Sequence, residues 1–448
     1  MKVSQLVGEL PTPWPEMLQP AIRRRVLDSG QTIVVLDDDP TGTQTVFDVP
    51  VITDWTGDHL ADAFGEGHPL IYVLTNSRAF PASEAGRINR EVAAALHHAA
   101  SETGRGFHVI SRSDSTLRGH FPLETDVLAE ELDLGGAPLV LIPFFEEGGR
   151  LTVDDVHYVV EGDQATPAAQ TAFARDSVFG FEHSNLAEWV EEKTAGRLPA
   201  GQMVSIPLKL IRGGGPAAVA DCLRGLPEGG VCIVNAVAMR DAEVVAAAIH
   251  ELWASGRKLL IRSAASIVRA LAGLPKRPLL ERSEVIDDDG RGGLIVVGSH
   301  VPKSTAQLEV LVRESDVVAV ELGEVDDTRA KIDRSLGDGR TVVLYTGRKL
   351  ITGESDEETL AIGQEISDSV VRVVAGLQAS PRFLIAKGGI TSSDLATKAL
   401  GIERATVIGQ LLPGVPVWRT AGGLGYVIFP GNVGGDDALY QAVRRLRG

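Results

Sequence analysis

The chain has little cysteine and no long apolar run, and both absences exclude whole classes of protein. Its two cysteines, Cys222 and Cys232, lack the neighbouring Cys or His residues of a zinc site. Two cysteines are also too few for disulfide bonds to hold a chain of 448 residues together. No run of about 18 apolar residues occurs, and the opening residues show no basic region followed by an apolar one. These absences disfavour a membrane span and a signal peptide, so we expect a cytoplasmic protein.

Positive charge is also scarce. The 43 Lys and Arg residues are outnumbered by 60 Asp and Glu residues, which gives a formal net charge of −17. An acidic surface repels nucleic acid and anionic membranes, so we expect neither as a partner. A small anionic ligand is still compatible with this charge, provided that backbone amides and a few local cations hold it.

The chain is long, rich in glycine, and built of apolar runs that alternate with alanine-rich stretches. At 448 residues it exceeds the usual size of one hydrophobic core, and its 44% hydrophobic content with 49 glycines is typical of α/β proteins. Apolar runs at 33–36 and 70–74 alternate with alanine-rich stretches such as 82–100, which predicts a mainly parallel sheet. The polar, glycine-rich segment 281–293 predicts a linker. We therefore expect two domains, 1–285 and 290–448, each a mainly parallel sheet flanked by helices.

The sharpest pattern in the second half is FLIAKGGITSSD at 383–394. An apolar strand runs through Gly388 and Gly389 into a helix, and Thr391 with Asp394 has the spacing of a capping box. Free amides at the helix start, with Lys387 beside them, predict a phosphate cradle. An ordinary tight turn between strand and helix is the alternative.

Two more glycine-rich turns follow strands of the same half. Residues 294–307 nearly match a Walker A loop, but the loop is one residue short and has Pro302 where glycine belongs, so it is no P-loop. Residues 422–436 are dense in glycine and fail the dinucleotide-binding register. Several such strand ends in one domain favour a ligand site, because parallel sheets bind ligands at the carboxyl ends of their strands.

Polar clusters follow two strands of the first half. The segment 37–41, DDDPT, suits a general base or a clamp for an acceptor hydroxyl, and a solvated turn is the alternative. The segment 111–120, SRSDSTLRGH, holds Arg112 and Arg118 among hydroxyls and a carboxylate. The planar fork of arginine matches a carboxylate, and hydroxyl and carboxylate groups suit a polyol, whereas a plain polar loop is the bland alternative.

Taken together in this order, the motifs resemble the four-carbon acid sugar kinase family. The resemblance spans nearly the whole chain, through DDPTG at 38–42, DSTLRG at 114–119, GRLT at 149–152 with HY at 157–158, FARDSVFG at 173–180, GS at 298–299, GGITS at 388–392 and FPGN at 429–432. It implies an N-terminal acid-sugar-binding domain and a C-terminal ATP-binding domain without a P-loop. The implied reaction, with ATP and Mg²⁺ as cofactors, transfers the γ-phosphoryl group to a terminal hydroxyl of a short sugar acid.

The resemblance also implies site residues, with no metal ligand assigned. The catalytic residues would be Asp38 and Asp39, and the acid sugar would contact Thr41, Arg112, Asp114, Ser115, Arg118, Arg150 and His157. ATP would contact Gly298, Ser299, Lys387, Gly388, Gly389, Ile390, Thr391, Gly423, Gly431 and Asn432.

Two residues depart from the family pattern on the acceptor side. Pro40 stands where many members have an aliphatic or aromatic residue, and Arg112 where many have Lys. Erythronate, threonate, a 3-oxo-tetronate and the branched 3-oxo-isoapionate therefore all stay open as acceptors, as does a homodimer. A non-catalytic nucleotide or acid-sugar sensor is the alternative of another class, and the absent G-x-G-x-x-G unit disfavours a dehydrogenase.

Overall fold

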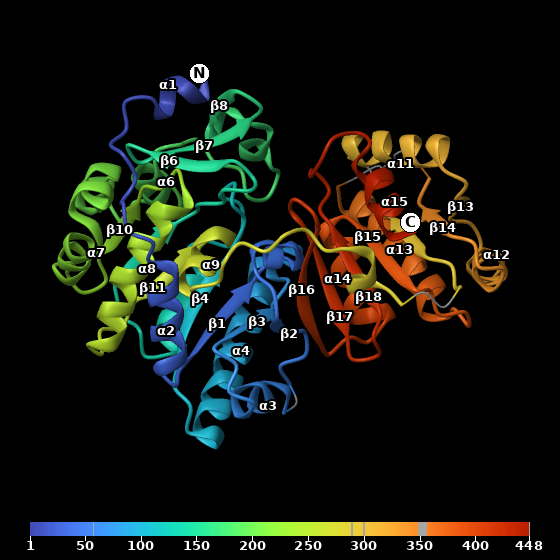
Figure 1. The fold of residues 1–448 in the computed structure, drawn as a ribbon, viewed down its shortest axis with the longest axis horizontal. Helices are drawn as coiled ribbons and strands as arrows, with labels where there is room; N and C mark the ends of the chain where they lie inside the picture. Colours follow the sequence, from blue (N-terminus) through green and yellow to red (C-terminus); the bar gives the residue numbers. More distant parts are fainter. Residues whose placement is uncertain (57, 288–289, 299–300, 348–355, 448) are drawn as a thin grey trace. The chain divides into compact units, whose positions relative to one another are not determined.

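The computed structural model describes residues 1–56, 58–287, 290–298, 301–347 and 356–447, with side chains omitted for 356–363. The chain divides into two compact units, Met1–Lys276 and Arg277–Gly448 (Figure 1). Among the described residues, no helix is both long and apolar enough to cross a membrane.

The first unit is built on a parallel sheet with the strand order β2-β3-β1-β4-β11-β5-β10-β9. Asp37, which ends β1, pairs with Leu74 of β3 and with Arg112 of β4, and Arg112 pairs in turn with Ser263 of β11. The carboxyl ends of these strands therefore lie along one edge. The strands are β1 (Thr32–Asp37), β2 (Val49–Ile52), β3 (Leu70–Leu74), β4 (Phe107–Arg112), β5 (Leu139–Ile142), β9 (Val204–Ile206), β10 (Val231–Val234) and β11 (Leu260–Ser263).

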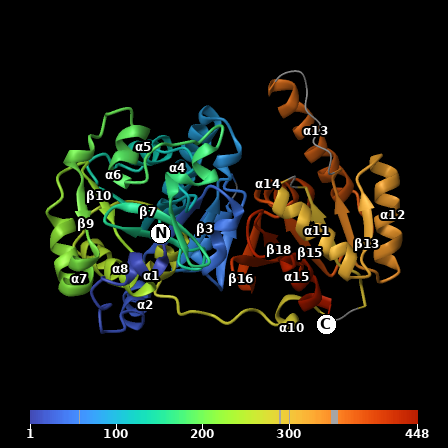
Figure 2. The same cartoon turned by 90° about the horizontal axis from the view of Figure 1, so that it is seen from above.

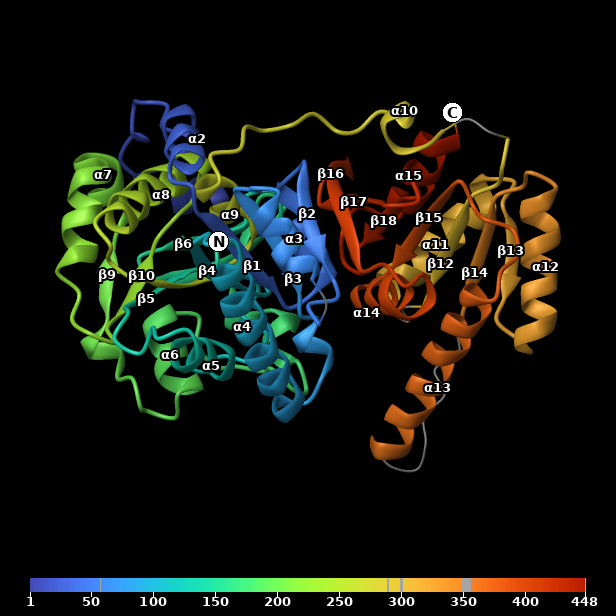
Figure 3. The same cartoon turned by 90° about the horizontal axis from the view of Figure 1, so that it is seen from below.

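Helices cover both faces of this sheet, which explains why its strands are continuous apolar runs. Val34 and Leu36 of β1 pack into the core beneath α3 (His59–Gly65), α4 (Ala82–Thr103), α5 (Leu123–Glu131) and α6 (Leu186–Lys193). Figure 3 shows α4, α5 and α6 on one side of the sheet and α2 (Gln19–Asp28), α8 (Met239–Ala254) and α9 (Ala265–Leu271) on the other. Helix α7 (Leu208–Arg224) packs on α8, and α1 (Val3–Val7) contacts β8.

A small antiparallel sheet, which the sequence patterns do not predict, follows β5. It consists of β6 (Arg150–Val153), β7 (Val156–Glu161) and β8 (Gln164–Pro167). Asp154 and Asp155 join β6 to β7, with φ of 48° and 63°. Two central residues with positive φ match the twist of a two-residue hairpin, and Asp tolerates that backbone better than most residues.

The second unit has a mixed sheet with the order β13-β14-β12-β15-β18-β17-β16. Its first five strands in that order are parallel, as expected, whereas β17 and β16 run antiparallel and are not predicted from the sequence. The strands are β12 (Leu294–Val297), β13 (Val318–Glu321), β14 (Val342–Tyr345), β15 (Phe383–Lys387), β16 (Arg404–Leu412), β17 (Val415–Thr420) and β18 (Gly425–Phe429).

The helices of the second unit pack against this sheet. Leu308 and Leu311 of α11 (Pro302–Glu314) share a core cluster with Leu439 and Val443 of α15 (Ala438–Arg447). Helices α12 (Val325–Gly337) and α13 (Asp356–Ala375) contact each other (Figure 2), and α10 (Arg282–Val285) contacts α15.

The turn from β15 into α14 (Gly389–Asp394) corrects one prediction. The residue before the helix is Gly388, with φ of 114°, so Thr391 lies inside the helix and forms no capping box with Asp394. A backbone of that φ strains any residue with a Cβ, which is why glycine occupies this position. The helix passes into a π-helical turn at Leu395–Ala399.

Candidate functional site

Three consecutive aspartates at the end of β1 have different partners. Asp37 Oδ1 accepts a hydrogen bond from Arg112 Nη1 at 2.9 Å, and Asp39 Oδ1 accepts one from the Thr41 backbone N–H at 2.8 Å, which caps a 3₁₀ turn at Pro40–Thr45. Asp38 Oδ2 accepts from Ser113 Oγ at 2.5 Å, while the buried Asp38 Oδ1 has no hydrogen-bond partner among the described residues. The buried Asp37 Oδ2 also has no hydrogen-bond partner among the described residues, so Asp37 and Asp38 each keep one oxygen without a donor.

Burial sets the proton affinity of these carboxylates. It raises the pKa of Asp37 to about 7 despite the neighbouring Arg112 guanidinium, and it also raises the pKa of Asp38. Burial acts on Asp39 in the same direction, but Arg78 and the Thr41 hydrogen bonds outweigh it and hold the pKa of Asp39 below its usual value. A carboxylate with a raised pKa binds a proton more readily, as a general base must.

Arg78 joins the two acidic loops, and sequence patterns gave no reason to select it. It lies in the 3₁₀ turn Ser77–Ala79 just past β3, where its Nη2 lies 2.6 Å from Asp39 Oδ2 and its Nη1 lies 3.4 Å from Asp114 Oδ1. The available signal was its position at a strand end along the same edge as the aspartates. Arg78 neutralises carboxylates that would otherwise repel one another.

The loop after β4 carries Asp114, Ser115 and Arg118. Asp114 Oδ2 accepts from Arg118 Nε at 2.7 Å and also from the Thr116 hydroxyl. Burial opposes ionisation of Asp114, but the Arg118 and Arg78 charges hold its pKa far below the usual value. Arg118 keeps 25% of its side chain exposed, and its Nη1 lies 3.5 Å from Asp176 Oδ2.

Two guanidinium groups approach the same aromatic ring. The Cζ of Arg118 lies 5.1 Å from the centroid of the Phe173 ring, and that of Arg150, at the start of β6, lies 5.6 Å from it. The buried Arg150 Nε has no hydrogen-bond partner among the described residues. Two partly exposed cations around one ring suit a ligand carboxylate.

A second buried ion pair, absent from the sequence prediction, lies beside the aspartates. Arg262 Nη1 of β11 donates to Glu124 Oε2 and to Ser111 Oγ, each at 2.6 Å. A Cβ at Gly119 would lie 2.5 Å from Ser113 Oγ and 3.0 Å from Asp38 Oδ2. Glycine therefore lets the arginine-bearing loop pass close over Asp38.

The structure corrects two predicted acceptor contacts. Arg112 is buried against Asp37, so it does not present an open fork to a substrate. His157 is also buried: its Nε2 donates to the Ser115 carbonyl at 2.8 Å, which leaves Nδ1 to accept from Thr152 Oγ1 at 3.0 Å. Burial lowers the pKa of His157 to about 4. His157 positions the loop at Ser115 rather than facing a ligand.

In the second unit, the predicted glycine turns meet at one edge of the sheet. Val297 pairs with Lys387, and Lys387 pairs with Phe429, so Gly298, Gly388 and Gly431 follow adjacent parallel strand ends. Gly389, Ile390 and Thr391 form the first turn of α14, and Ile390 is 61% exposed. Asn432, also exposed, follows Gly431, whereas Ser299 lies outside the described residues.

Gly298 and Thr391 pack directly against each other. A Cβ at Gly298 would lie 2.5 Å from Thr391 Oγ1 and 3.4 Å from its Cγ2. Such a separation is shorter than van der Waals contact, so the β12 turn and α14 can approach this closely only with glycine at 298.

Two other predicted nucleotide contacts are corrected. Lys387 points into the protein, where its Nζ donates to the carbonyls of Pro430 at 2.7 Å and Gly431 at 3.0 Å, so it does not line an open phosphate cradle. Gly423 lies in the turn between β17 and β18, before the amino end of β18. It is therefore at the opposite edge of the sheet from the other predicted glycines. The geometry of the hairpin, rather than a ligand, explains the glycine at this position.

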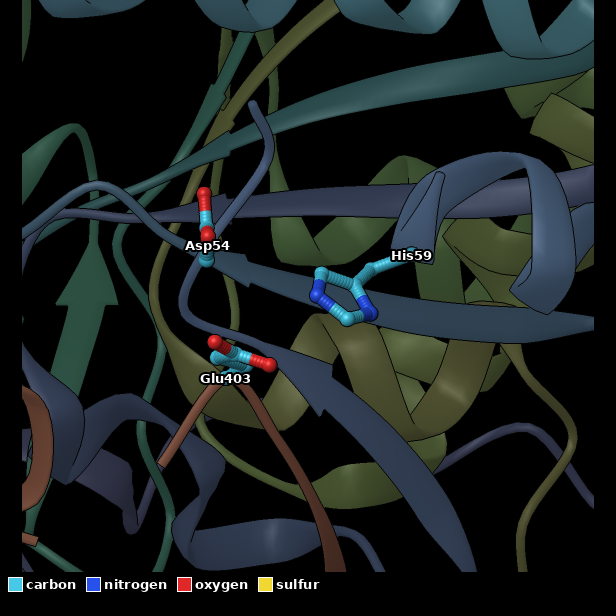
Figure 4. Close-up of side chains that lie close together, drawn as sticks. All are labelled: Asp54, His59 and Glu403. Atoms are coloured by element: carbon cyan, nitrogen blue, oxygen red, sulfur yellow. The ribbon is translucent and has the colours of Figure 1, made fainter. Parts of the chain in front are cut away.

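Within either unit taken by itself, the described residues hold no group of at least three His, Cys, Asp or Glu side chains placed to bind a metal ion. Figure 4 draws Asp54 and His59 of the first unit together with Glu403, which belongs to the second. Asp54 Oδ1 accepts from the Thr56 N–H at 2.9 Å. This carboxylate serves its own loop, and we assign no metal site to it.

Comparison with known proteins gives two family matches. Residues 33–271 match the model of a sugar-binding N-terminal domain, and residues 294–439 match that of a nucleotide-binding C-terminal domain. A 3-oxo-tetronate kinase of Cupriavidus necator is 28% identical over 408 residues, covering 86% of this chain and 88% of the relative. A 3-oxo-tetronate kinase of Pseudomonas fluorescens is 26% identical over 372 residues, covering 76% and 79%.

Solved structures share the fold. A Salmonella typhimurium LT2 protein aligns with a TM-score of 0.66 over 92% of this chain and 99% of its own, at 18% identity. A Haemophilus influenzae protein aligns with a TM-score of 0.60 over 92% and 100%, also at 18% identity.

Proposed function

The chain belongs to the four-carbon acid sugar kinase family, a family of phosphotransferases, and on that premise we propose that it transfers the γ-phosphoryl group of ATP to a terminal hydroxyl of a four-carbon acid sugar. The relatives named 3-oxo-tetronate kinase make a 3-oxo-tetronate the first acceptor to test. Erythronate, threonate and 3-oxo-isoapionate are the other candidates.

The observation that carries this proposal is the pair of guanidinium groups at Phe173. In a protein of net charge −17, an anionic acceptor must be held by cations placed at its site. Arg118 and Arg150 meet that need, since both lie by the Phe173 ring and both side chains stay partly exposed. The carboxylate of the acid sugar would bind there, with its hydroxyls beside the loop that carries Asp114 and Ser115.

Asp38 is our candidate for the group that receives the acceptor's proton. Its uncommitted Oδ1 and its raised pKa suit a general base, while Ser113 fixes its other oxygen. Phosphoryl transfer needs mainly positioning and charge stabilisation, so one well-placed carboxylate is sufficient on the acceptor side.

ATP would bind at the glycine-rich edge of the second unit, beside Gly298, Gly388–Thr391 and Gly431. Exposed Ile390 would offer apolar contact to the nucleoside. Magnesium would neutralise the phosphates. We assign it no protein ligands, because Mg²⁺ is often held by phosphates and water with few protein groups.

An acceptor panel tests the proposal. The protein is incubated with ATP, Mg²⁺ and each four-carbon acid sugar, and ADP release is followed with the neutral tetritol of matching stereochemistry as the control. We expect release with at least one acid and little with the tetritol. ATP binding without release for any acid would favour a sensor, and a change in NAD(P)H absorbance would favour a dehydrogenase.

Arg118→Lys tests the carboxylate site itself. Lysine keeps the charge but loses the bidentate fork, so the KM for the acid should rise steeply while ATP affinity holds. If the variant discriminates acid from tetritol as well as wild type, the carboxylate does not bind at Arg118.

A further inference from the structure

Two buried side chains hold the loop after β18 by its carbonyl groups. Lys387 of β15 donates to the carbonyls of Pro430 at 2.7 Å and Gly431 at 3.0 Å. Gln307 of α11 donates through Nε2 to the carbonyls of Val433 at 3.0 Å and Gly435 at 2.7 Å. Both side chains have 0% exposure, so these carbonyls are turned inward from two directions.

Inward carbonyls fix the direction of the neighbouring amides. In a trans peptide unit the N–H points opposite to the C=O, and the peptide bonds of this loop are trans. The N–H groups of Gly431, Asn432 and Gly434 therefore point away from Lys387 and Gln307. In the described part of the chain, none of these three amides donates a hydrogen bond. Successive amides that point outward together form a concavity that binds anions.

We propose that residues 430–435 form an anion-binding loop for the terminal phosphates of the nucleotide, with Lys387 and Gln307 as the positioning residues that keep its amides outward. This inference rests on the proposed function, in which the second unit binds ATP. It gives Lys387 a role different from direct phosphate contact, since a fully buried amine bonded to two carbonyls cannot reach a ligand.

The charge of Lys387 agrees with this role. No carboxylate lies within ion-pair distance of Lys387 among the described residues, and its Nζ lies 4.4 Å from the centroid of the Phe429 ring. Burial, together with Lys303, lowers its pKa to about 7. The Lys387 amine is therefore only partly charged near neutral pH, and an anion on the far side of the loop would favour its charged form.

The test compares phosphate binding with nucleoside binding in the full chain. Lys387→Met keeps the length and apolar contact of the side chain, and Gln307→Leu keeps its approximate volume, but each removes the donors. The control is Leu311→Ala, one turn along α11, which lowers stability by opening the core without touching the loop. Calorimetry measures the Kd of ATP, of adenosine and of inorganic tripolyphosphate.

We expect the Kd of ATP and of tripolyphosphate to rise about 10-fold or more in both positioning variants, because amides that are no longer held outward lose charge-assisted hydrogen bonds to phosphate. The Kd of adenosine should stay within about 2-fold of wild type, and Leu311→Ala should change none of them beyond that range. Unchanged ATP binding in both positioning variants, or equal losses for ATP and adenosine, would overturn the inference. The inference would also be overturned if the Kd values of Lys387→Met and Gln307→Leu changed no more than those of Leu311→Ala.

Failure of the loop and failure of the proposed function give different results. If wild type binds ATP and phosphorylates an acid sugar while both variants bind ATP normally, the loop assignment alone is wrong. If tripolyphosphate binding depends on Lys387 and Gln307 but no acid sugar is phosphorylated, the loop stands and the kinase proposal fails.

Discussion

At the scale of single residues, the first unit gives three adjacent aspartates three different surroundings. Asp37 binds Arg112 through Oδ1 and keeps a buried Oδ2 without a hydrogen-bond partner among the described residues, whereas Asp39 caps a turn and pairs with Arg78. Asp38 also retains such an oxygen, and unlike Asp37 it lies beside the arginine-bearing loop, where Ser113 holds its Oδ2 next to Gly119. An unsatisfied buried oxygen costs stability, and sites of catalysis are where such costs are retained.

We therefore predict that Asp38→Asn lowers kcat by about 100-fold, because the amide keeps the shape but cannot take up the acceptor's proton. Steady-state kinetics with the best acid sugar measure this. Asp39→Asn is the matched control: it should weaken the loop and raise KM, since Asp39 binds Arg78 and Thr41, but kcat should fall less. A larger kcat loss for Asp39→Asn than for Asp38→Asn would reverse the assignment.

His157 supplies a prediction about pH. Its pKa is about 4 in the fold and about 6.5 in the unfolded chain, so its contribution to stability is complete above pH 6.5 and is lost as the pH falls from there towards 4. Between pH 7 and 5, wild type should lose about 2 kcal/mol through this residue. His157→Gln, whose amide can still donate to Ser115, should lack that loss. Urea unfolding of the first unit at the two pH values checks the difference, and equal losses in both proteins would refute a buried neutral histidine.

At the scale of elements, the sequence predicts the strands that are buried on both faces and the loops that follow their carboxyl ends. Strands such as β1 and β15 are continuous apolar runs because helices cover both faces of the parallel sheets. By contrast, β16 alternates in burial, and the β6–β8 sheet is short, so neither has a strong run. Antiparallel pairing depends on distant partners that local patterns do not reveal.

The same limit applies to the candidate sites. Sequence patterns place Asp38, Arg118 and Gly388 at strand ends, where the structure has them. They do not tell which way a side chain points, so the inward turn of Lys387 and the burial of His157 could not be predicted. Isolated residues that complete the clusters, such as Arg78, have no local signature.

The contact between the β12 turn and α14 makes a prediction at this scale. Gly298→Ala would place a Cβ 2.5 Å from Thr391 Oγ1 and should destabilise the second unit by about 1–3 kcal/mol, as overpacking does. Thr391→Ala removes the obstructing hydroxyl, so the double variant should recover most of that loss. Denaturant unfolding of the wild type, both single variants and the double variant gives the coupling. If the losses in unfolding free energy of the two single variants simply add in the double variant, the turn accommodates the new Cβ without contact with Thr391, and the prediction is wrong.

At the scale of the whole molecule, the chain has two compact units, each with its own sheet and core. Separate cores allow separate unfolding transitions, each stabilised only by the ligand that its own unit binds. A ligand at 100 times its Kd stabilises its site by about 2.7 kcal/mol, enough to move a calorimetric transition visibly.

We predict that ATP with Mg²⁺ raises the Tm of one transition and the acid sugar raises that of the other. Core-weakening variants identify the transitions: Val92→Ala, in the α4 core, should lower the first unit's Tm, and Leu311→Ala, in α11, the second's. ATP should then shift the transition that responds to Leu311→Ala. A single transition moved by either ligand would show that the units unfold cooperatively, and ATP acting on the transition that Val92→Ala lowers would place the nucleotide in the first unit, against the proposal.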